Sequence, residues 1–320
     1  MLRKILGAAL SLAVCAHPAC AQEQPPLSSS VAPAYVRPNP PGQLVSVSAG
    51  RRLHMLCKGS GDGPVVVIEA GLSQYTANST YGRAQDAISS FARVCTYDRA
   101  GLGWSDPAPE DWTHNGMVQD LHGLLQAADI REPVILVGHS LGGLLVRSYV
   151  SAYPHDVVGV VLVDATSEAN FAEIEAASAA TVPQIDAALA TARPGEPVVG
   201  MPAGTSPEVV MAFTPEILLG VKREFEALDR LPAAMKQPGG FGGLGDLPLI
   251  VISRGKTSQP PSQADLQHRA GQEALATLSS NGLLIVAQNS GHTIPLDEPQ
   301  VVADAVRRVT EAAGVGGSLT

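Results

Sequence analysis

The 320-residue chain has few aromatic residues, few charged residues and few cysteines. Phe, Trp and Tyr make up 4% of it, which argues against a stacking surface for sugars or nucleic-acid bases. Acidic residues outnumber basic ones by 30 to 21, and no run of five or more Lys or Arg occurs, so a nucleic-acid partner is not expected. Apolar residues make up 45% and charged residues 16%, a balance that excludes intrinsic disorder and predicts a large core.

Long apolar runs are also missing. The run Ile5–Ala16 follows two basic residues and is too short to span a bilayer, and small residues at 19–21 follow it. This pattern is typical of a secretory signal peptide, although a buried helix is the alternative. We predict cleavage after Ala21 and a secreted or periplasmic protein. No later segment is long enough for a membrane span, and 22–42, rich in Pro and Ser, is predicted to be a disordered lead-in.

Only four cysteines are present, and Cys15 and Cys20 lie in the predicted signal peptide. The other two, Cys57 and Cys95, would then fold in an oxidising compartment, where an even number of cysteines favours a disulfide. Two buried free thiols are the alternative. No Cys/His cluster has the spacing of metal ligands and no phosphate-binding loop is present, so neither a metal nor a cofactor is expected.

Short apolar runs alternate with helical patterns along most of the chain. This alternation predicts an α/β fold with a mostly parallel sheet that is covered by helices on both faces. Eight strands are predicted, at 44–48, 51–57, 64–70, 92–97, 133–138, 157–163, 249–253 and 283–287. Helices are predicted at 115–128, 141–153 and 299–312.

One long interval breaks this alternation. Residues 165–245 show helical patterns at 169–190 and 207–231 but no clear strand. Roughly 80 residues is far more than one crossover needs, so we predict a helical cap, the alternative being ordinary crossover helices. Apolar residues of this cap either line an acyl pocket or pack it onto the sheet: Phe171, Met201, Met211, Phe213 and Phe225. The predicted organisation is a core of 43–164 and 246–313, a cap of 165–245 and a tail of 314–320.

Residues 138–142 read Gly-His-Ser-Leu-Gly and lie between a predicted buried strand and a predicted helix. In this G-x-S-x-G pattern, a sharp strand-to-helix turn exposes the serine at the carboxyl end of the sheet. Gly138 and Gly142 are needed because larger side chains would collide in so tight a turn. The helix amino terminus also favours developing negative charge. The pattern predicts Ser140 as a nucleophile, the alternative being a serine that only caps the helix.

With this turn the chain resembles the α/β-hydrolase superfamily, from about 44 to 312. Three other segments support the resemblance. Residues 69–72 (Glu-Ala-Gly-Leu) stand where many members have His-Gly-x. Residues 98–105 match the family's Asp-x-x-Gly-x-Gly-x-Ser turn, and Ser-Gly-His at 290–292 precedes the last helix. The resemblance implies the eight-stranded sheet of that fold and a catalytic triad in the order Ser, acid, His.

A serine nucleophile needs a base, and eight histidines are available. His292 alone lies in a loop after a strand, where the family places its base, and we predict it in that role. The others fall in the signal peptide, a strand, helices or turns. His139 adjoins the nucleophile but is expected to point away from the turn, and His268 is assigned to a polar helical stretch without a role.

The position of the third triad member, the catalytic acid, departs from the usual family pattern. Most members carry it after the strand predicted at 249–253, but no Asp or Glu occurs from 249 to 264. Some haloalkane dehalogenases and related hydrolases place it at the end of the strand that follows the nucleophile helix. Asp164 stands there and is the predicted acid, with Asp265 as the alternative and helix capping as the other role of Asp164.

The resemblance implies further roles near this site. The backbone amides of Leu141 and Leu72 are expected to bind the oxyanion. Asp98 and Arg99 are interpreted as structural residues. Asp98 is expected to hold its turn beside the loop after Ala70, which contains Leu72. In this superfamily the second and fourth strands are neighbours, and a disulfide between Cys57 and Cys95 is therefore predicted.

The nucleophile limits the reaction. A serine in this turn excludes the dehalogenase and epoxide hydrolase reactions, for which the superfamily uses Asp. We expect hydrolysis of a carboxylic ester of a small-molecule acyl substrate through an acyl-serine intermediate. Hydrolysis of an amide, lactone or peptide, and a cofactor-free perhydrolase or acyltransferase, are the alternatives. A non-catalytic binding member of the fold is a further alternative.

Overall fold

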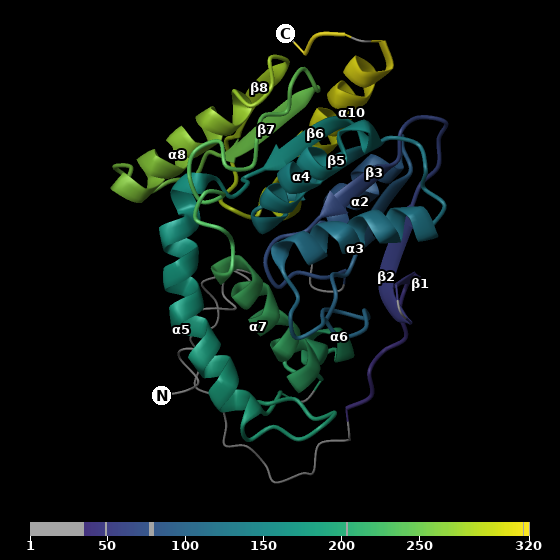
Figure 1. Cartoon of the computed structure of the whole chain (residues 1–320), viewed down its shortest axis with the longest axis vertical. Helices are drawn as coiled ribbons and strands as arrows, with labels where there is room; N and C mark the ends of the chain where they lie inside the picture. Colours follow the sequence, from purple (N-terminus) through teal and green to yellow (C-terminus); the bar gives the residue numbers. More distant parts are fainter. Residues whose placement is uncertain (1–34, 49, 77–79, 203, 316, 320) are drawn as a thin grey trace.

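The computed structural model describes residues 35–48, 50–76, 80–202, 204–315 and 317–319, so the predicted signal peptide and most of the lead-in lie outside the described residues. Eight strands form one sheet in the order β1-β2-β4-β3-β5-β6-β7-β8 (Figure 1). Their bounds are β1 Gln43–Ser48, β2 Arg51–Lys58, β3 Val66–Glu69, β4 Val94–Tyr97, β5 Val134–His139, β6 Val157–Val163, β7 Leu249–Arg254 and β8 Gly282–Ala287. Strand β2 is antiparallel to both neighbours, and all the strands from β4 to β8 are parallel, which confirms the predicted fold.

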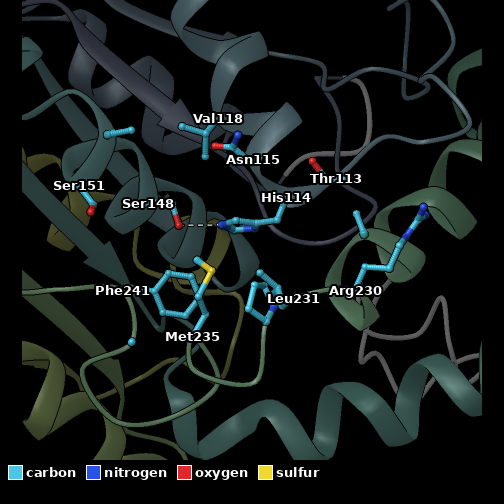
Figure 2. Close-up of a pocket in the computed structure, with 14 residues that line it drawn as sticks. Thr113, His114, Asn115, Val118, Ser148, Ser151, Arg230, Leu231, Met235 and Phe241 are labelled. Atoms are coloured by element: carbon cyan, nitrogen blue, oxygen red, sulfur yellow. Dashed lines mark hydrogen bonds between the residues drawn. The ribbon is translucent and has the colours of Figure 1, made fainter.

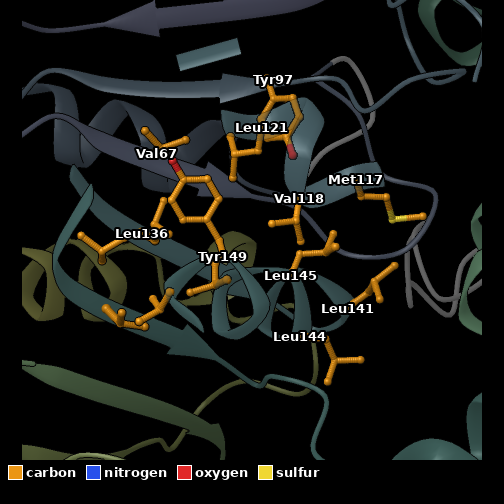
Figure 3. Packing of buried hydrophobic residues seen from close by; sticks show 14 of the residues in the cluster. Val67, Tyr97, Met117, Val118, Leu121, Leu136, Leu141, Leu144, Leu145 and Tyr149 are labelled. Atoms are coloured by element: carbon orange, nitrogen blue, oxygen red, sulfur yellow. The ribbon is translucent and has the colours of Figure 1, made fainter. Parts of the chain in front are cut away.

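The inner strands are continuous apolar runs because both faces of the sheet are covered. Side chains alternate between the faces: Leu136 of β5 packs toward α3 and α4, whereas Ile135 and Val137 pack toward α2 and α10. Figure 3 shows side chains of α3 and α4 meeting those of the strands. The helices of the core are α2 Gly82–Ser89, α3 His114–Ala127, α4 Leu141–Ala152, α8 Gln263–Ala276, α9 Ile294–Asp297 and α10 Pro299–Val315.

The sequence pattern does not define α2 and α8 as separate helices, because their buried faces are made largely of small or polar residues. The buried residues of α2 are Ala84, Gln85 and Ile88. Those of α8 are His268, Gly271, Gln272 and Leu275. Such faces give little apolar periodicity, so tertiary contacts decide where these helices pack.

The residues between β6 and β7 form the helices α5 Phe171–Leu189, α6 Pro207–Met211 and α7 Pro215–Asp229, which lie beyond one end of the sheet (Figure 1). Three of the apolar residues considered above, Phe171, Met211 and Phe225, are at most 5% exposed. Their burial favours packing of these helices over an open acyl pocket at those positions. Among the described residues, no helix combines the length and apolar character that crossing a membrane requires.

Residues 35–42, which belong to the predicted lead-in, contact the core. The indole of Trp104 donates a hydrogen bond to the carbonyl of Pro38 at 2.7 Å, and the amide of Gly42 donates to Nε2 of His54 at 3.1 Å. Trp104 and His54 are both buried, so the core supplies fixed partners to a segment without regular secondary structure. Composition alone does not reveal such partners.

Cys57 and Cys95 form the predicted disulfide. They lie directly opposite each other on the antiparallel strands β2 and β4, with their Cα atoms 4.0 Å apart. The bond joins residues with a sequence separation of 38 and closes a loop that contains β3 and α2. It therefore fastens the antiparallel edge of the sheet to its parallel part.

Candidate active site

Ser140 occupies a strained turn between β5 and α4. Its φ of +53° and ψ of −122° lie in a region that residues other than glycine rarely adopt. A Cβ at Gly142 would lie 2.1 Å from the carbonyl oxygen of Glu69, and a Cβ at Gly138 would lie 2.7 Å from that of Gly142. The two glycines therefore allow the turn, as the sequence pattern requires. The turn is held by the amide of Thr166, which donates to the Ser140 carbonyl at 2.9 Å.

Asp164 follows β6, the strand next to β5, and is 1% exposed. Its Oδ2 accepts a hydrogen bond from Nδ1 of His292 at 2.6 Å, and its Oδ1 accepts one from Nε2 of His268 at 2.7 Å. Arg254 donates to both oxygens, from its amide at 3.0 Å and from Nη1 at 3.1 Å. Burial opposes ionisation, but the hydrogen bonds from the two imidazoles outweigh it and hold the pKa of Asp164 well below its usual value.

His292 lies in the loop between β8 and α9, with 30% of its side chain exposed. Since the Asp164 carboxylate can only accept, Nδ1 of His292 carries the proton and Nε2 is left with a free lone pair. Within the described residues no hydrogen bond joins the hydroxyl of Ser140 to this ring. Such bonds are often long without substrate and tighten when it binds. The structure thus brings the predicted acid and the predicted base, Asp164 and His292, into direct contact.

His139, the residue before Ser140, anchors the loop that contains His292. Its Nε2 donates to the carbonyl of His292 at 2.9 Å, and the centroids of the two rings are 4.7 Å apart. Burial, with a smaller contribution from the neighbouring His292, lowers the pKa of His139 to about 3. His139 is therefore a neutral structural residue at physiological pH.

The buried His139 makes stability depend on pH. Between about pH 3 and the ordinary value of 6.5, the unfolded chain binds a proton that folded His139 excludes, so this group lowers the free energy of unfolding as the pH falls. Urea unfolding at pH 7 and pH 5 should show that the wild type loses about 2 kcal/mol more than His139→Gln over this interval. Equal losses in the two proteins would contradict the burial of a neutral imidazole.

The segment 70–72, which is predicted to bind the oxyanion and is here called the oxyanion loop, lies against Ser140. A Cβ at Gly71 would lie 3.3 Å from Cβ of Ser140. Arg99 holds the loop, because its guanidinium donates to the carbonyls of Ala70 at 2.7 Å and Gly71 at 2.6 Å. Leu72, whose amide is predicted to be the second oxyanion donor, follows Gly71 directly in the chain.

A buried ion-pair network connects this loop to α7. Arg99, 2% exposed, also donates to Glu69 at 2.6 Å and to Glu224 of α7. Glu224 in turn accepts from the amide of Ser73 at 2.7 Å. Burial raises the pKa of Glu69, although Arg99 and the hydroxyl of Tyr97 oppose this. A single guanidinium is therefore the shared ion-pair partner of two buried carboxyl groups.

Asp98 has the structural role predicted for it. Its oxygens accept hydrogen bonds from the amide of Thr76 at 2.6 Å, the amide of Trp104 at 3.0 Å and Nδ1 of His54 at 2.9 Å. The residue is completely buried. These bonds hold the turn after β4 beside the oxyanion loop. Both oxygens of the Asp98 carboxylate are used as hydrogen-bond acceptors in doing so.

Asp265, the alternative acid, lies elsewhere. It forms a capping box at the start of α8, where it accepts from the amide of Ser262 at 2.9 Å and donates its own amide to the Ser262 hydroxyl at 3.1 Å. Hydrogen bonds from Ser258 and Ser262 hold its pKa below the usual range. The carboxylate that contacts His292 is that of Asp164.

The sequence did not reveal two residues that the structure brings to the site, His268 and Glu224. His268 shares the buried face of α8 with Gly271, Gln272 and Leu275, a face with too little apolar periodicity to signal burial in the sequence. Glu224 lies among apolar residues on the buried face of α7. A glutamate in that setting indicates a buried partner, but which cation it meets depends on the fold.

A family model described as the alpha/beta hydrolase family matches residues 70–305, most of the chain. The chain belongs to this family. The hydrolase is 28% identical over 258 residues to the uncharacterized protein YqjL of Bacillus subtilis, covering 80% of this chain and 87% of that protein. No cluster of three or more His, Cys, Asp or Glu residues that could hold a metal occurs in the described part of the hydrolase.

Solved structures share the fold at low sequence identity. A thermophilic esterase from Thermogutta terrifontis aligns with a TM-score of 0.59 at 16% identity, over 84% of this chain and 97% of that one. The enol-lactonase from Burkholderia xenovorans LB400 aligns with a TM-score of 0.59 at 18% identity, over 83% and 98%. At these identities the likeness establishes the fold of the hydrolase.

Proposed function

We propose that this hydrolase cleaves carboxylic esters through a covalent acyl intermediate on Ser140. The observation that carries the proposal is the bond from Nδ1 of His292 to the buried Asp164 beside the strained serine turn. This bond fixes the tautomer whose Nε2 can accept a proton from the serine hydroxyl. A serine is a weak nucleophile without such a base.

The proposed reaction has two halves. The hydroxyl oxygen of Ser140 attacks the ester carbonyl while Nε2 of His292 takes its proton, and Asp164 stabilises the imidazolium. The amides of Leu141 and Leu72 donate to the oxyanion. His292 then gives the proton to the leaving alcohol. In the second half His292 activates a water molecule, which attacks the acyl-serine and releases the carboxylic acid.

The proposal also places the mature hydrolase outside the cytoplasm, after cleavage following Ala21. The disulfide between Cys57 and Cys95 supports this location, because such bonds persist in oxidising compartments. The intact mass of the exported protein tests both points. A mass that includes residues 1–21, or one that shows two free thiols, would contradict them.

A fluorophosphonate probe tests for an activated serine without a guess about the substrate. We expect one adduct per chain by intact mass, mapped to Ser140 by peptide analysis. Hydrolysis of nitrophenyl acetate and butyrate, compared with the matching anilides and with lactones, then separates esterase activity from the alternatives. A folded protein that forms no adduct would overturn the proposal and favour a binding role. Faster cleavage of anilides or lactones than of esters would show that amides or lactones, rather than esters, are the substrate class.

His268 should act as a positioning residue for Asp164. The substitution His268→Leu removes one hydrogen bond to the buried carboxylate, so we expect kcat for nitrophenyl butyrate to fall about tenfold with KM nearly unchanged. The variant His268→Gln keeps a donor and should recover much of kcat. If both variants lose activity in proportion to lost thermal stability, His268 is merely part of the core.

A further inference from the structure

The middle of helix α7 is fixed against the segment that follows β4. A Cβ at Gly220 would lie 2.1 Å from the carbonyl oxygen of Gly101, so the two backbones touch at this point. Three residues further along the helix, Arg223 donates a hydrogen bond to the carbonyl of Ala108. Glu224 comes next and is completely buried. A helix that is held in place therefore presents the carboxylate of Glu224 to the core.

The end of α7, by contrast, borders a cavity. Ala227, near the end of the helix, and Leu231, just after it, line a space of about 490 Å³ that α3 and α4 also border (Figure 2). Its lining contains neither Ser140 nor any residue of the oxyanion loop. The connection from α7 to the proposed catalytic centre therefore runs from the middle of the helix and not from its end.

The oxyanion loop continues into a strained turn. The amide of Gln74 donates to the carbonyl of Gly71 at 3.2 Å, which closes a β-turn over these four residues. Ser73 is the third residue of the turn and has a φ of +59°, a conformation that favours glycine or asparagine at this position. The amide of Ser73 donates to Oε2 of Glu224 at 2.7 Å. If the central peptide flipped, Ser73 would gain an ordinary φ but would lose this bond.

Glu224 also acts on the loop through Arg99. Its Oε1 accepts a hydrogen bond from Nε of Arg99, and the terminal nitrogens of the same guanidinium hold the carbonyls of Ala70 and Gly71. The C=O and N–H of a trans peptide point in opposite directions, so the bond to the Gly71 carbonyl also fixes the direction of the Leu72 amide. The peptide groups on both sides of Leu72 are therefore held by Glu224 or by its partner Arg99.

We propose that Glu224 is a positioning residue for the oxyanion site, because it keeps the turn over 71–74 in the form that presents the Leu72 amide to the substrate. The inference rests on the proposed acyl transfer at Ser140. The Leu72 amide is needed most when negative charge develops on the carbonyl oxygen, so a misplaced amide slows the reaction more than it weakens substrate binding. Glu224 acts on the reaction through this turn and through Arg99, not by contact with the substrate.

The substitution Glu224→Gln tests this role and leaves Glu69 as the carboxylate partner of Arg99. We expect kcat for nitrophenyl butyrate to fall about 10–100-fold with KM nearly unchanged. The inhibition constant of a boronic acid, which forms a tetrahedral adduct on serine, should rise by the same factor. The pH profile of kcat/KM should keep its shape, because the relay is untouched. Glu226→Gln, on the same helix at a carboxylate that is 35% exposed, is the matched control and should retain the wild-type values.

A change that only loosens α7 should behave differently. Leu231→Ala enlarges the cavity at the end of the helix, so the urea midpoint should fall while kcat stays the same. Should Glu224→Gln fail to fold, Glu224→Asp keeps the charge beside Arg99 but shortens the side chain by one methylene, and kcat should still fall. Wild-type kcat in a folded Glu224→Gln or Glu224→Asp variant would overturn the inference.

Amide hydrogen exchange separates this inference from the proposed function, because it needs no substrate. The Ser73 amide should exchange about tenfold faster in Glu224→Gln than in the wild type, and at the wild-type rate in Glu226→Gln. Unchanged exchange at Ser73 in Glu224→Gln would refute the role of Glu224 in fixing the turn. A wild type that forms no fluorophosphonate adduct would instead refute the acyl transfer, and exchange at Ser73 would still decide whether Glu224 fixes the turn.

Discussion

Alanine in place of Ser140 should leave a folded hydrolase that forms no fluorophosphonate adduct and hydrolyses esters about 10⁴–10⁶-fold more slowly. The loss is this large because serine and base act as one unit, so that removing the nucleophile removes the whole acyl-enzyme route. The activity that remains would come from substrate binding and the oxyanion donors alone. Burst-phase kinetics with nitrophenyl acetate measure both the adduct-forming step and turnover.

Two comparisons make this result specific. Ser151, an exposed serine on the same helix α4, provides the matched control, and Ser151→Ala should keep the wild-type rate. Thermal unfolding of Ser140→Ala should resemble that of the wild type, since alanine is no larger than serine. If Ser140→Ala hydrolyses esters as fast as Ser151→Ala, another group is the nucleophile and the proposed mechanism is wrong.

The second large effect is expected at Arg99. The substitution Arg99→Met leaves Glu69 and Glu224 buried without their shared cation, and it removes the donors to the oxyanion loop. Breaking a buried ion pair in this way should reduce the free energy of unfolding by about 3–5 kcal/mol. Urea unfolding at pH 7, followed by circular dichroism, measures this change.

Arg52 offers a matched control because it also pairs with a carboxylate, that of Asp106, but in an exposed setting. Arg52→Met should change stability far less than Arg99→Met. Should Arg99→Met fail to fold, Arg99→Lys keeps the charge but cannot reproduce the forked set of donors. In that variant we expect kcat to fall more than stability, because the carbonyls of Ala70 and Gly71 lose their fixed partner. Stability and kcat unchanged in Arg99→Lys would refute the positioning role.

The elements that the sequence predicted best are those with a local physical cause. The strand that ends at His139 is a continuous apolar run, and the turn after it needs glycine on both sides because of steric collisions within a few residues. Both features depend only on residues that are close together in the sequence. The boundaries predicted for this strand and for α4 therefore differ from the structure by one residue.

The choice of the catalytic acid shows the limit of what short sequence segments can predict. The absence of carboxylates from 249 to 264 directed attention to Asp164, which related hydrolases favour as a position, and left Asp265 as the alternative. The order β6-β7-β8 in the sheet brings Asp164, after β6, to His292, after β8, whereas the Asp265 carboxylate is engaged in a capping box. The choice between them is a property of strand order, which no short segment encodes.

By itself, the sequence determined the parallel sheet and the nucleophile turn, because apolar periodicity and steric demands act over a few residues. The strand neighbours that made the Cys57–Cys95 disulfide predictable were implied by the resemblance to the α/β-hydrolase superfamily. The tertiary structure alone decided that His268 supports Asp164 and that Glu224 reaches Arg99 across 125 residues. It also decided that residues 35–42 are fastened to the core. Those contacts join polar groups far apart in the chain, and their partners exist only once the apolar core has placed them side by side.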